Sequence, residues 1–122
     1  MSLIRLKINI RNQKYPIIIG NNILNNLHSF LKKNLNNFNQ CLVVVDQNVP
    51  KKLINNALNS LSKKQKTIHY LNASEKNKNQ NSVNKILDIL LKQNFSREDC
   101  LISIGGGITG DISGFAASLF KR

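Results

Sequence analysis

The sequence predicts one α/β domain, residues 1–122, in which a Rossmann-like parallel sheet carries helices on both faces and follows an N-terminal β-hairpin. Three observations predict this class. Two apolar runs, at 41–45 and 101–104, have the composition of strands buried on both faces. Stripes of apolar residues at three- and four-residue steps lie between them, so helices and strands alternate. A segment rich in glycine joins the second run to a final helical stripe.

The N-terminal residues have the two-residue period of β-strands. Apolar side chains alternate with polar ones from Leu3 to Ile10 and predict a strand. A turn at 11–14 leads to a second predicted strand, Tyr15–Ile19, which ends at Gly20. Because the turn is short, we expect the two strands to form an antiparallel hairpin at one edge of the fold.

Four helical stripes and three strand segments follow the hairpin. Asn21 or Asn22 could cap the first helix, and Pro50 suits the first turn of the second. Right-handed crossovers between the parallel strands would give a doubly wound sheet. We expect helices at 23–35, 53–61, 83–91 and 112–120, strands at 41–45, 66–71 and 101–104, and loops at 72–81 and 105–110.

The composition excludes several classes of protein. Hydrophobic residues make up 41% and charged residues 20% of the chain, which is typical of a globular domain rather than a disordered one. No apolar run reaches the roughly 18 residues of a membrane-spanning helix, and no export signal is evident. Cys41 and Cys100 each open an apolar run, so we expect reduced core thiols in a cytoplasmic protein.

The net charge of +12 would suit a nucleic acid, an anionic membrane or a phosphorylated ligand. The lysines are scattered through every segment, however, and arginine, which is favoured for bidentate contacts to phosphate and guanine, occurs only four times. The chain also contains 20 asparagines, and the codons of Asn and Lys are both rich in A and T. We therefore attribute the charge to an AT-rich genome and expect no specific nucleic-acid partner and no membrane partner.

The glycine-rich segment carries the first functional signal. Gly105, Gly107 and Gly110 satisfy the pattern G-x-G-x-x-G, and Asp111 follows. A strand that runs through glycines into a helix presents free N–H groups to a phosphate above the strand. The alternative is a tight turn without a ligand, in which Asp111 only stabilises the first turn of the helix.

Two other segments should end at the same edge of the sheet, where ligands of open α/β folds bind. Asp46 and Asn48 follow the first buried strand, and a carboxylate there can accept hydrogen bonds from ribose hydroxyls. Alternatively, Asp46 caps the helix that follows Pro50. Lys78 lies in the loop after the next strand and could reach a phosphate. Alternatively, that loop only carries solvated charge.

The segment from Gly105 to Ala117 resembles the signature of the 3-dehydroquinate synthase family. It reads GGGITGD and then GFAA, and Phe120 and Arg122 fit the aromatic and arginine places that follow. Upstream, Glu75 and Lys78 match a loop of the form DGE-x-x-K. The resemblance covers the whole chain and is strongest in the glycine-rich segment.

This resemblance implies an NAD site on the α/β domain. This sequence departs from the family pattern at two places: Ala73-Ser74 replace Asp-Gly, and Thr109 replaces an apolar residue. The implied cofactor-binding residues are Asp46, Asn48, Glu75, Lys78, Gly106, Gly107, Ile108, Thr109, Gly110 and Asp111.

The resemblance also implies an activity for the complete protein. The family converts 3-deoxy-D-arabino-heptulosonate 7-phosphate to 3-dehydroquinate and phosphate in the shikimate pathway of aromatic amino acid biosynthesis. It uses NAD and a zinc or cobalt ion, and a homodimer is possible. The metal ligands belong to a helical C-terminal domain, so we expect no catalytic residue and no metal ligand in residues 1–122, and neither His28 nor His69 has clustered partners. The chain alone should be inactive and only marginally folded.

Three alternatives remain open. Sugar-phosphate cyclases of secondary metabolism share most of the pattern. Iron-dependent alcohol and glycerol dehydrogenases share the fold, but their loop usually carries serine after the glycines, whereas Ile108-Thr109-Gly110 stand before Asp111 here. A small basic nucleic-acid-binding module would explain the charge without catalysis, and its affinity should fall steeply with salt.

Overall fold

The computed structural model describes residues 3–11, 13–35 and 37–121. Asn12 of the predicted turn and Arg122 of the family pattern lie outside these residues. The strands are β1 (Ile4–Ile10), β2 (Gln13–Ile19), β3 (Gln40–Asp46), β4 (Gln65–Leu71) and β5 (Cys100–Ile104). The helices are α1 (Leu27–Asn34), α2 (Lys51–Ser60), α3 (Gln80–Lys92) and α4 (Gly107–Phe120), with short 3-10 turns η1 (Ile23–Asn26) and η2 (Glu75–Asn77).

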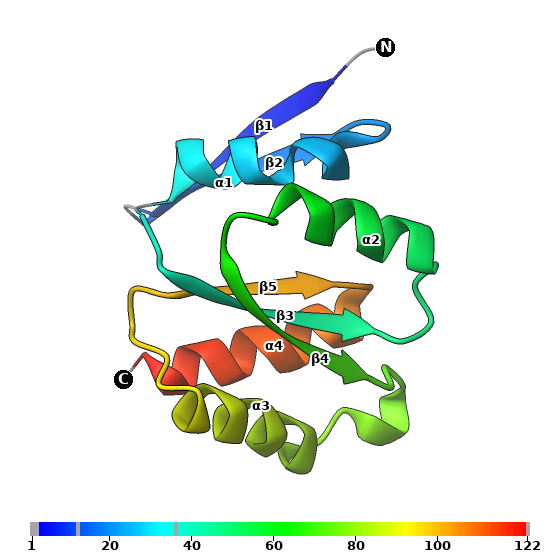
Figure 1. Ribbon diagram of the computed structural model, residues 1–122, viewed down its shortest axis with the longest axis vertical. Helices are drawn as coiled ribbons and strands as arrows, with labels where there is room; N and C mark the ends of the chain where they lie inside the picture. The colour runs from blue at the N-terminus through cyan, green and yellow to red at the C-terminus, as the bar shows by residue number, and fades with distance from the viewer. Residues whose placement is uncertain (1–2, 12, 36, 122) are drawn as a thin grey trace.

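A parallel sheet of three strands, in the order β4-β3-β5, forms the centre of the molecule. Helices α1 and α2 lie on one face of this sheet, and α3 and α4 lie on the other (Figure 1). The arrangement confirms the predicted fold class, a doubly wound parallel sheet preceded by a hairpin. No helix among the described residues is long and apolar enough to cross a membrane.

Strand β3 supplies the core of both layers. Its residues 41–45 are completely buried, as the apolar run predicts. Leu42 and Val44 pack with α3 and α4, whereas Val43 and Val45 pack on the opposite face. Cys41 is paired in register with Cys100 on β5, and both are free thiols. Burial raises the pKa of Cys100 to about 11, which keeps this thiol protonated and unreactive.

Strand β5 differs from the prediction, because it is not buried on both faces. Most of its residues are half-exposed, and Ser103 is exposed. The reason is its position: among the described residues β5 pairs only with β3 and is an edge of the sheet. The apolar composition of a strand indicates which side chains it can bury, but it does not indicate how many strands will pair with it.

The N-terminal hairpin forms at one edge of the fold, as predicted. Strands β1 and β2 pair antiparallel, and among the described residues they form a two-stranded sheet that is separate from the parallel one. The hairpin lies beyond α1, at the end of the molecule opposite α3 and α4 (Figure 1). Nearly all of its residues are exposed.

Two helix starts differ from the prediction. The first helix begins as the 3-10 turn η1, and Asn22 precedes it in a left-handed conformation without a side-chain capping hydrogen bond. The last helix begins at Gly107, so the predicted loop of 105–110 shrinks to Gly105 and Gly106. Glycine favours loops in a sequence, but the apolar residues spaced along α4 pack on the sheet and favour the helix.

Candidate functional site

The candidate site lies at the carboxyl edge of the parallel sheet. In the register of the strands, Asp46 at the end of β3 is opposite Leu71 at the end of β4, and Val45 is opposite Ile104 at the end of β5. The segments that follow these three strands therefore converge at one edge. This is the place where open α/β sheets bind their ligands.

Gly105 makes the turn between β5 and α4 possible. Its φ of +157° disfavours other residues, and a Cβ atom there would lie 2.6 Å from Oγ1 of Thr109 and 3.0 Å from Cβ of Asp46. The missing side chain thus lets the start of α4 and the end of β3 approach each other. Glycine is required here by the packing of the protein itself.

Gly106 and Gly107 are different, because a Cβ atom at either position would meet nothing within 4 Å. Gly106 is the N-cap of α4 and Gly107 its first residue, so the first N–H groups of the helix face open space at the carboxyl edge. The packing of the described residues does not require glycine at these two positions. They leave room for the close approach of a ligand.

Ile108 and Thr109 turn their side chains inward. Ile108 packs against the core between the sheet and α3 and α4. Thr109 is completely buried beneath the turn, and its hydroxyl has no hydrogen-bond partner. A ligand at the carboxyl edge would therefore meet the backbone of these two residues.

Asp46 and Asn48 form a small hydrogen-bonded turn after β3. Oδ1 of Asp46 accepts hydrogen bonds from the backbone N–H of Asn48 at 3.0 Å and from its side-chain amide at 3.2 Å. Helix α2 has Pro50 at its N-cap and no side-chain capping bond, so Asp46 does not cap that helix. Asn48 is exposed and Asp46 is half-exposed at the edge.

The loop between β4 and α3 is held by asparagine side chains. The Asn77 side-chain amide donates to the carbonyl of Asn72 at 3.0 Å, and Asn79 caps α3 by accepting from the N–H of Ser82 at 3.0 Å. The Ser82 hydroxyl donates to the carbonyl of Asn77 at 2.7 Å. These bonds close the loop without the Asp-Gly pair of the family pattern. Glu75 lies in η2 and is exposed.

Lys78 of this loop reaches across to helix α4. Its Nζ lies 2.9 Å from Oδ2 of Asp111, and both side chains remain partly exposed. The hydrogen bond to Asp111 and the charge of its carboxylate raise the pKa of Lys78. The ion pair borders a small hollow of about 220 Å³ that Val83 and Phe115 also line. Lys78 is thus held in an ion pair and is not only a solvated charge. This pair was not predicted, because it depends on how α3 packs beside α4.

Asp111 and Gly110 both lie in α4, and they face different sides of this helix. Asp111 lies in the second turn of α4 rather than the first, because the helix starts at Gly107, so the alternative of a first-turn acid is wrong. Asp111 points to Lys78 and the α3 side. Gly110 instead lines a separate cavity on the β5 side of α4.

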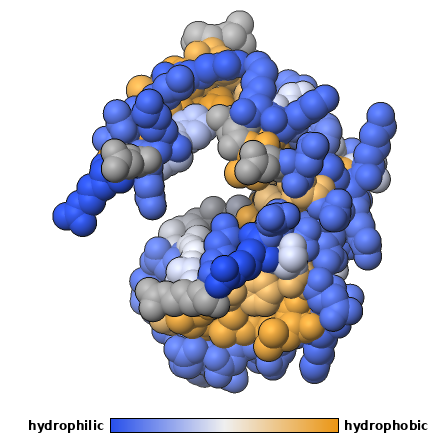
Figure 2. Space-filling view, turned by 90° about the vertical axis from the view of Figure 1, so that its left-hand side faces the viewer, coloured by the Kyte–Doolittle hydropathy of each residue, from blue (hydrophilic) through white to orange (hydrophobic). Residues whose placement is uncertain are grey.

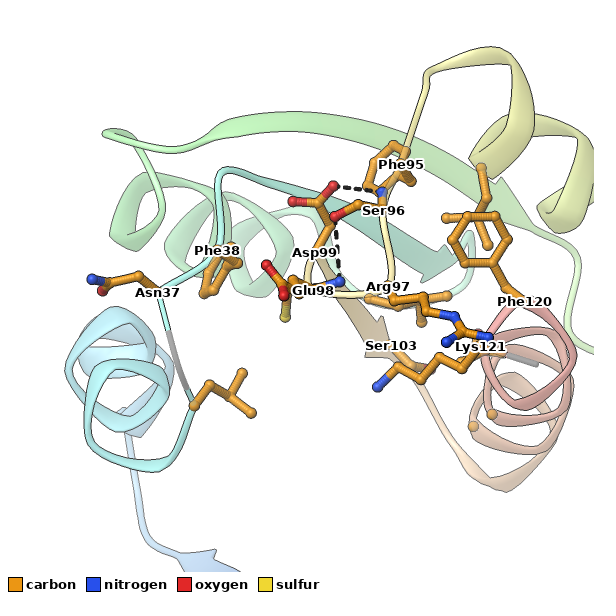
Figure 3. A pocket seen from close by; sticks show the side chains of 18 residues that line it. Asn37, Phe38, Phe95, Ser96, Arg97, Glu98, Asp99, Ser103, Phe120 and Lys121 are labelled. Carbon is orange, nitrogen blue, oxygen red and sulfur yellow. Dashed lines mark hydrogen bonds between the residues drawn. The ribbon is translucent and has the colours of Figure 1, made fainter.

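That cavity has a volume of about 660 Å³ and lies beside the amino end of β5 (Figure 3). Phe38, Phe95 and Phe120 line it together with the loop of residues 96–99 (Figure 3). Asp99 anchors this loop by accepting the N–H of Ser96 at 2.8 Å. Of the predicted site residues only Gly110 borders the cavity, so it is distinct from the carboxyl edge.

Among the residues that the structure describes, no group of three or more His, Cys, Asp or Glu side chains could hold a metal ion. His69 lies on β4, and burial, together with the charge of Lys85, lowers its pKa. Its Nε2 atom is buried without a hydrogen-bond partner. His28 lies in α1.

Comparison with known proteins extends these observations. The family model described as 3-dehydroquinate synthase N-terminal matches residues 68–122. The 3-dehydroquinate synthase of Pelagibacter ubique (strain HTCC1062) is 64% identical over the full 122 residues, and that of Buchnera aphidicola subsp. Cinara cedri (strain Cc) is 37% identical over 96% of the chain. The chain spans about a third of the length of these curated relatives, 33% and 32% respectively.

Among solved structures, 2-deoxy-scyllo-inosose synthase complexed with carbaglucose-6-phosphate, NAD⁺ and Co²⁺ matches 98% of this chain and 33% of its own, with a TM-score of 0.85 and 21% identity. The chain therefore has the fold of the matching third of that synthase. The sequence matches are more specific than this likeness of fold. Over its whole length the chain is similar in sequence to curated 3-dehydroquinate synthases, and the matching family model is that of their N-terminal part.

Proposed function

We propose that this chain is the NAD-binding part of a 3-dehydroquinate synthase. The complete protein converts 3-deoxy-D-arabino-heptulosonate 7-phosphate to 3-dehydroquinate and phosphate, as a lyase of the shikimate pathway. The support is the 64% identity to a curated 3-dehydroquinate synthase together with the family signature at the carboxyl edge. NAD supplies a reversible hydride acceptor, and a divalent metal, zinc or cobalt, supplies a Lewis acid.

The geometry of the carboxyl edge fits a dinucleotide. Gly106 and Gly107 leave open space in front of the first N–H groups of α4, and these groups favour the pyrophosphate of NAD. Ile108 and Thr109 contribute backbone, because their side chains point inward. This open space, where the chain itself does not require glycine, is the observation that carries the assignment of the site.

The polar residues around this space have separate proposed roles. Asp46 and Asn48 form a turn at the end of β3 that can receive ribose hydroxyls. Lys78 and Asp111, held together 2.9 Å apart, can contact the cofactor on the α3 side. Glu75 is exposed in the same loop and can accept a hydrogen bond from it. Gly110 completes the glycine pattern in the first turns of α4, and a Cβ atom there would also meet nothing within 4 Å.

We further propose that residues 1–122 form one NAD-binding domain that is inactive alone, with the metal ligands and most substrate-binding residues supplied by a C-terminal domain of the complete enzyme. The basis is the family resemblance and the length of the relatives, about three times that of this chain. The two free thiols support a cytoplasmic location.

The test is NAD binding to the complete gene product, measured by isothermal titration calorimetry, with and without Asp111→Ala. A charge-assisted hydrogen bond is worth about 1.5–3 kcal/mol, so we expect an affinity at least about tenfold weaker in the variant. Glu98→Ala is the matched control, because it removes an exposed acid next to the 660 Å³ cavity instead. Equal affinity of Asp111→Ala and wild type would refute the assignment of this residue.

Activity assays separate the alternative within the same fold class. The fold match to 2-deoxy-scyllo-inosose synthase supports a related sugar-phosphate cyclase as the second candidate. The complete protein should release phosphate from 3-deoxy-D-arabino-heptulosonate 7-phosphate and not from glucose 6-phosphate. The reverse preference would favour the second candidate.

A further inference from the structure

Lys78 differs from the other basic residues in its ion pair. Lysine and arginine together number 18, and they are spread through the chain. Figure 2 views the molecule from the amino ends of the parallel strands, and hydrophilic side chains cover much of this face, which lies away from the candidate site. Among the described residues, Lys78 and Asp111 form the one ion pair between side chains. Basic charge alone therefore does not single out Lys78, whereas its fixed position does.

Asp111 fixes the side chain of Lys78. The backbone of the loop is already held, because the side chain of Asn77 closes it and Asn79 caps α3. A lysine side chain is flexible and loses rotamer freedom when it is held in one position. The 2.9 Å contact with Asp111 directs Nζ of Lys78 toward α4. The hydrogen bond and the charge of Asp111, together with the charge of Glu75, raise the pKa of Lys78 and keep its amine protonated.

Lys78 in turn neutralises the carboxylate of Asp111. Asp111 lies one turn after Gly107, so the two positions share a face of α4. The open space in front of Gly107 is where we place the pyrophosphate of the cofactor. An unpaired carboxylate one turn away, at about 5–6 Å along the helix, would repel this doubly charged group. The ion pair removes the repulsion and adds no net charge.

We propose that Lys78 and Asp111 act as one unit in cofactor binding, so that neither side chain contributes without the other. This rests on the proposed function, because it concerns the same cofactor site. Asp111 is a positioning residue for Lys78, and Lys78 compensates the acid beside the phosphates. The contact also joins the loop after β4 to α4, so both sides of the 220 Å³ hollow are held together.

The test is a double-mutant cycle on the affinity of the complete gene product for NAD, measured by isothermal titration calorimetry. Asp111→Ala and Lys78→Met should each weaken binding at least about tenfold, because each breaks a charge-assisted hydrogen bond. The double variant should be no weaker than either single variant, within about twofold. Two independent contacts would multiply to a loss of about a hundredfold or more, and this result would overturn the proposal.

Lys76→Met is the matched control, because it removes an exposed lysine of the same loop. This variant should keep the affinity of wild type within about twofold. A loss equal to that of Lys78→Met would overturn the proposal, since it would show an effect of general charge. A wild type that does not bind NAD would instead refute the proposed function, so the two failures are distinguishable.

A second measurement needs no cofactor. NMR of isotope-labelled lysine side chains follows the pKa of Lys78, which should be lower in Asp111→Asn than in wild type. Asp88→Asn, which removes an exposed acid of α3, should leave this pKa unchanged. Because an ion pair between partly exposed side chains contributes little to stability, the variants should fold, as circular dichroism checks. An unchanged pKa of Lys78 in Asp111→Asn would overturn the proposal.

Discussion

At the scale of single residues, Gly105 and Gly107 distinguish an effect on stability from an effect on binding. Gly105→Ala places a methyl group within 3.0 Å of Thr109 and Asp46 on a backbone that disfavours it, so we expect a loss of about 2 kcal/mol or more in the free energy of unfolding. Gly107→Ala meets open space and should leave stability unchanged or slightly higher.

Urea denaturation and NAD titration of both variants check this prediction. Gly107→Ala should weaken NAD binding while the unfolding midpoint is kept, because its methyl group fills the space in front of the helix. An unchanged midpoint for Gly105→Ala would contradict the close approach of α4 and β3. Unchanged NAD affinity for Gly107→Ala would contradict the cofactor site.

His69 predicts a pH dependence of stability. Burial lowers the pKa of His69 below the ordinary value of 6.5, and the charge of Lys85 is the second cause of this shift. The unfolded chain therefore binds the proton more readily than the folded chain. Stability should be full above pH 6.5 and should fall as the pH is lowered from there through the folded pKa. The midpoint of urea unfolding, measured across this range, checks the sign.

Two variants attribute the effect to His69. His69→Leu should abolish this part of the pH dependence, because it removes the titratable imidazole. It also removes a buried nitrogen that has no hydrogen-bond partner. Lys85→Gln should reduce the dependence, since it removes the second cause of the shift. The same slope in all three proteins would contradict the role of His69.

The sequence predicts that the candidate residues lie at the carboxyl edge, but it does not predict their contacts with one another. Glycine between a strand and a helix, and acids at strand ends, are visible in a sequence because the topology of parallel sheets sends them to one edge. The contact between Lys78 and Asp111 depends on the packing of two helices, so it cannot be predicted from the sequence of either segment alone. The same holds for Asn77, whose side chain closes a loop through a backbone carbonyl.

At the scale of elements, α4 contains a replaceable glycine. Gly114 lies inside this helix, and a Cβ atom there would meet nothing within 4 Å. Since alanine is favoured over glycine by about 0.8–1 kcal/mol in a helix interior, Gly114→Ala should stabilise the protein by about that amount. The change in thermal midpoint measures the effect. Destabilisation would show that another segment packs closely on this turn of α4 in the complete protein.

The elements themselves were largely predictable, because each buries an apolar face with its own period. Strand β3 and helix α3 illustrate this, since their buried residues follow the predicted pattern. The exposure of β5 and the separate sheet of the hairpin were not predictable. Both depend on which strands become neighbours, and strand pairing is a property of the whole fold rather than of a segment.

At the scale of the whole molecule, the net charge of +12 predicts weak binding to polyanions without sequence preference. A contact with about four phosphates would lose roughly a hundredfold in affinity for a fourfold rise in salt. Fluorescence anisotropy with duplex DNA measures this dependence. Appreciable affinity at physiological salt would instead support the nucleic-acid-binding module. The marginal stability expected of residues 1–122 alone stays a prediction.

The complete burial of β3 also determines how slowly its backbone amides exchange hydrogen with solvent. Its amide groups are hydrogen-bonded to strands on both sides, and its residues 41–45 are inaccessible to solvent. Solvent deuterium can reach these amides only when the sheet itself comes apart, whereas the exposed hairpin should exchange through local fraying. The slowest-exchanging amides of the molecule should therefore lie in β3, and their rate would report global opening of the domain.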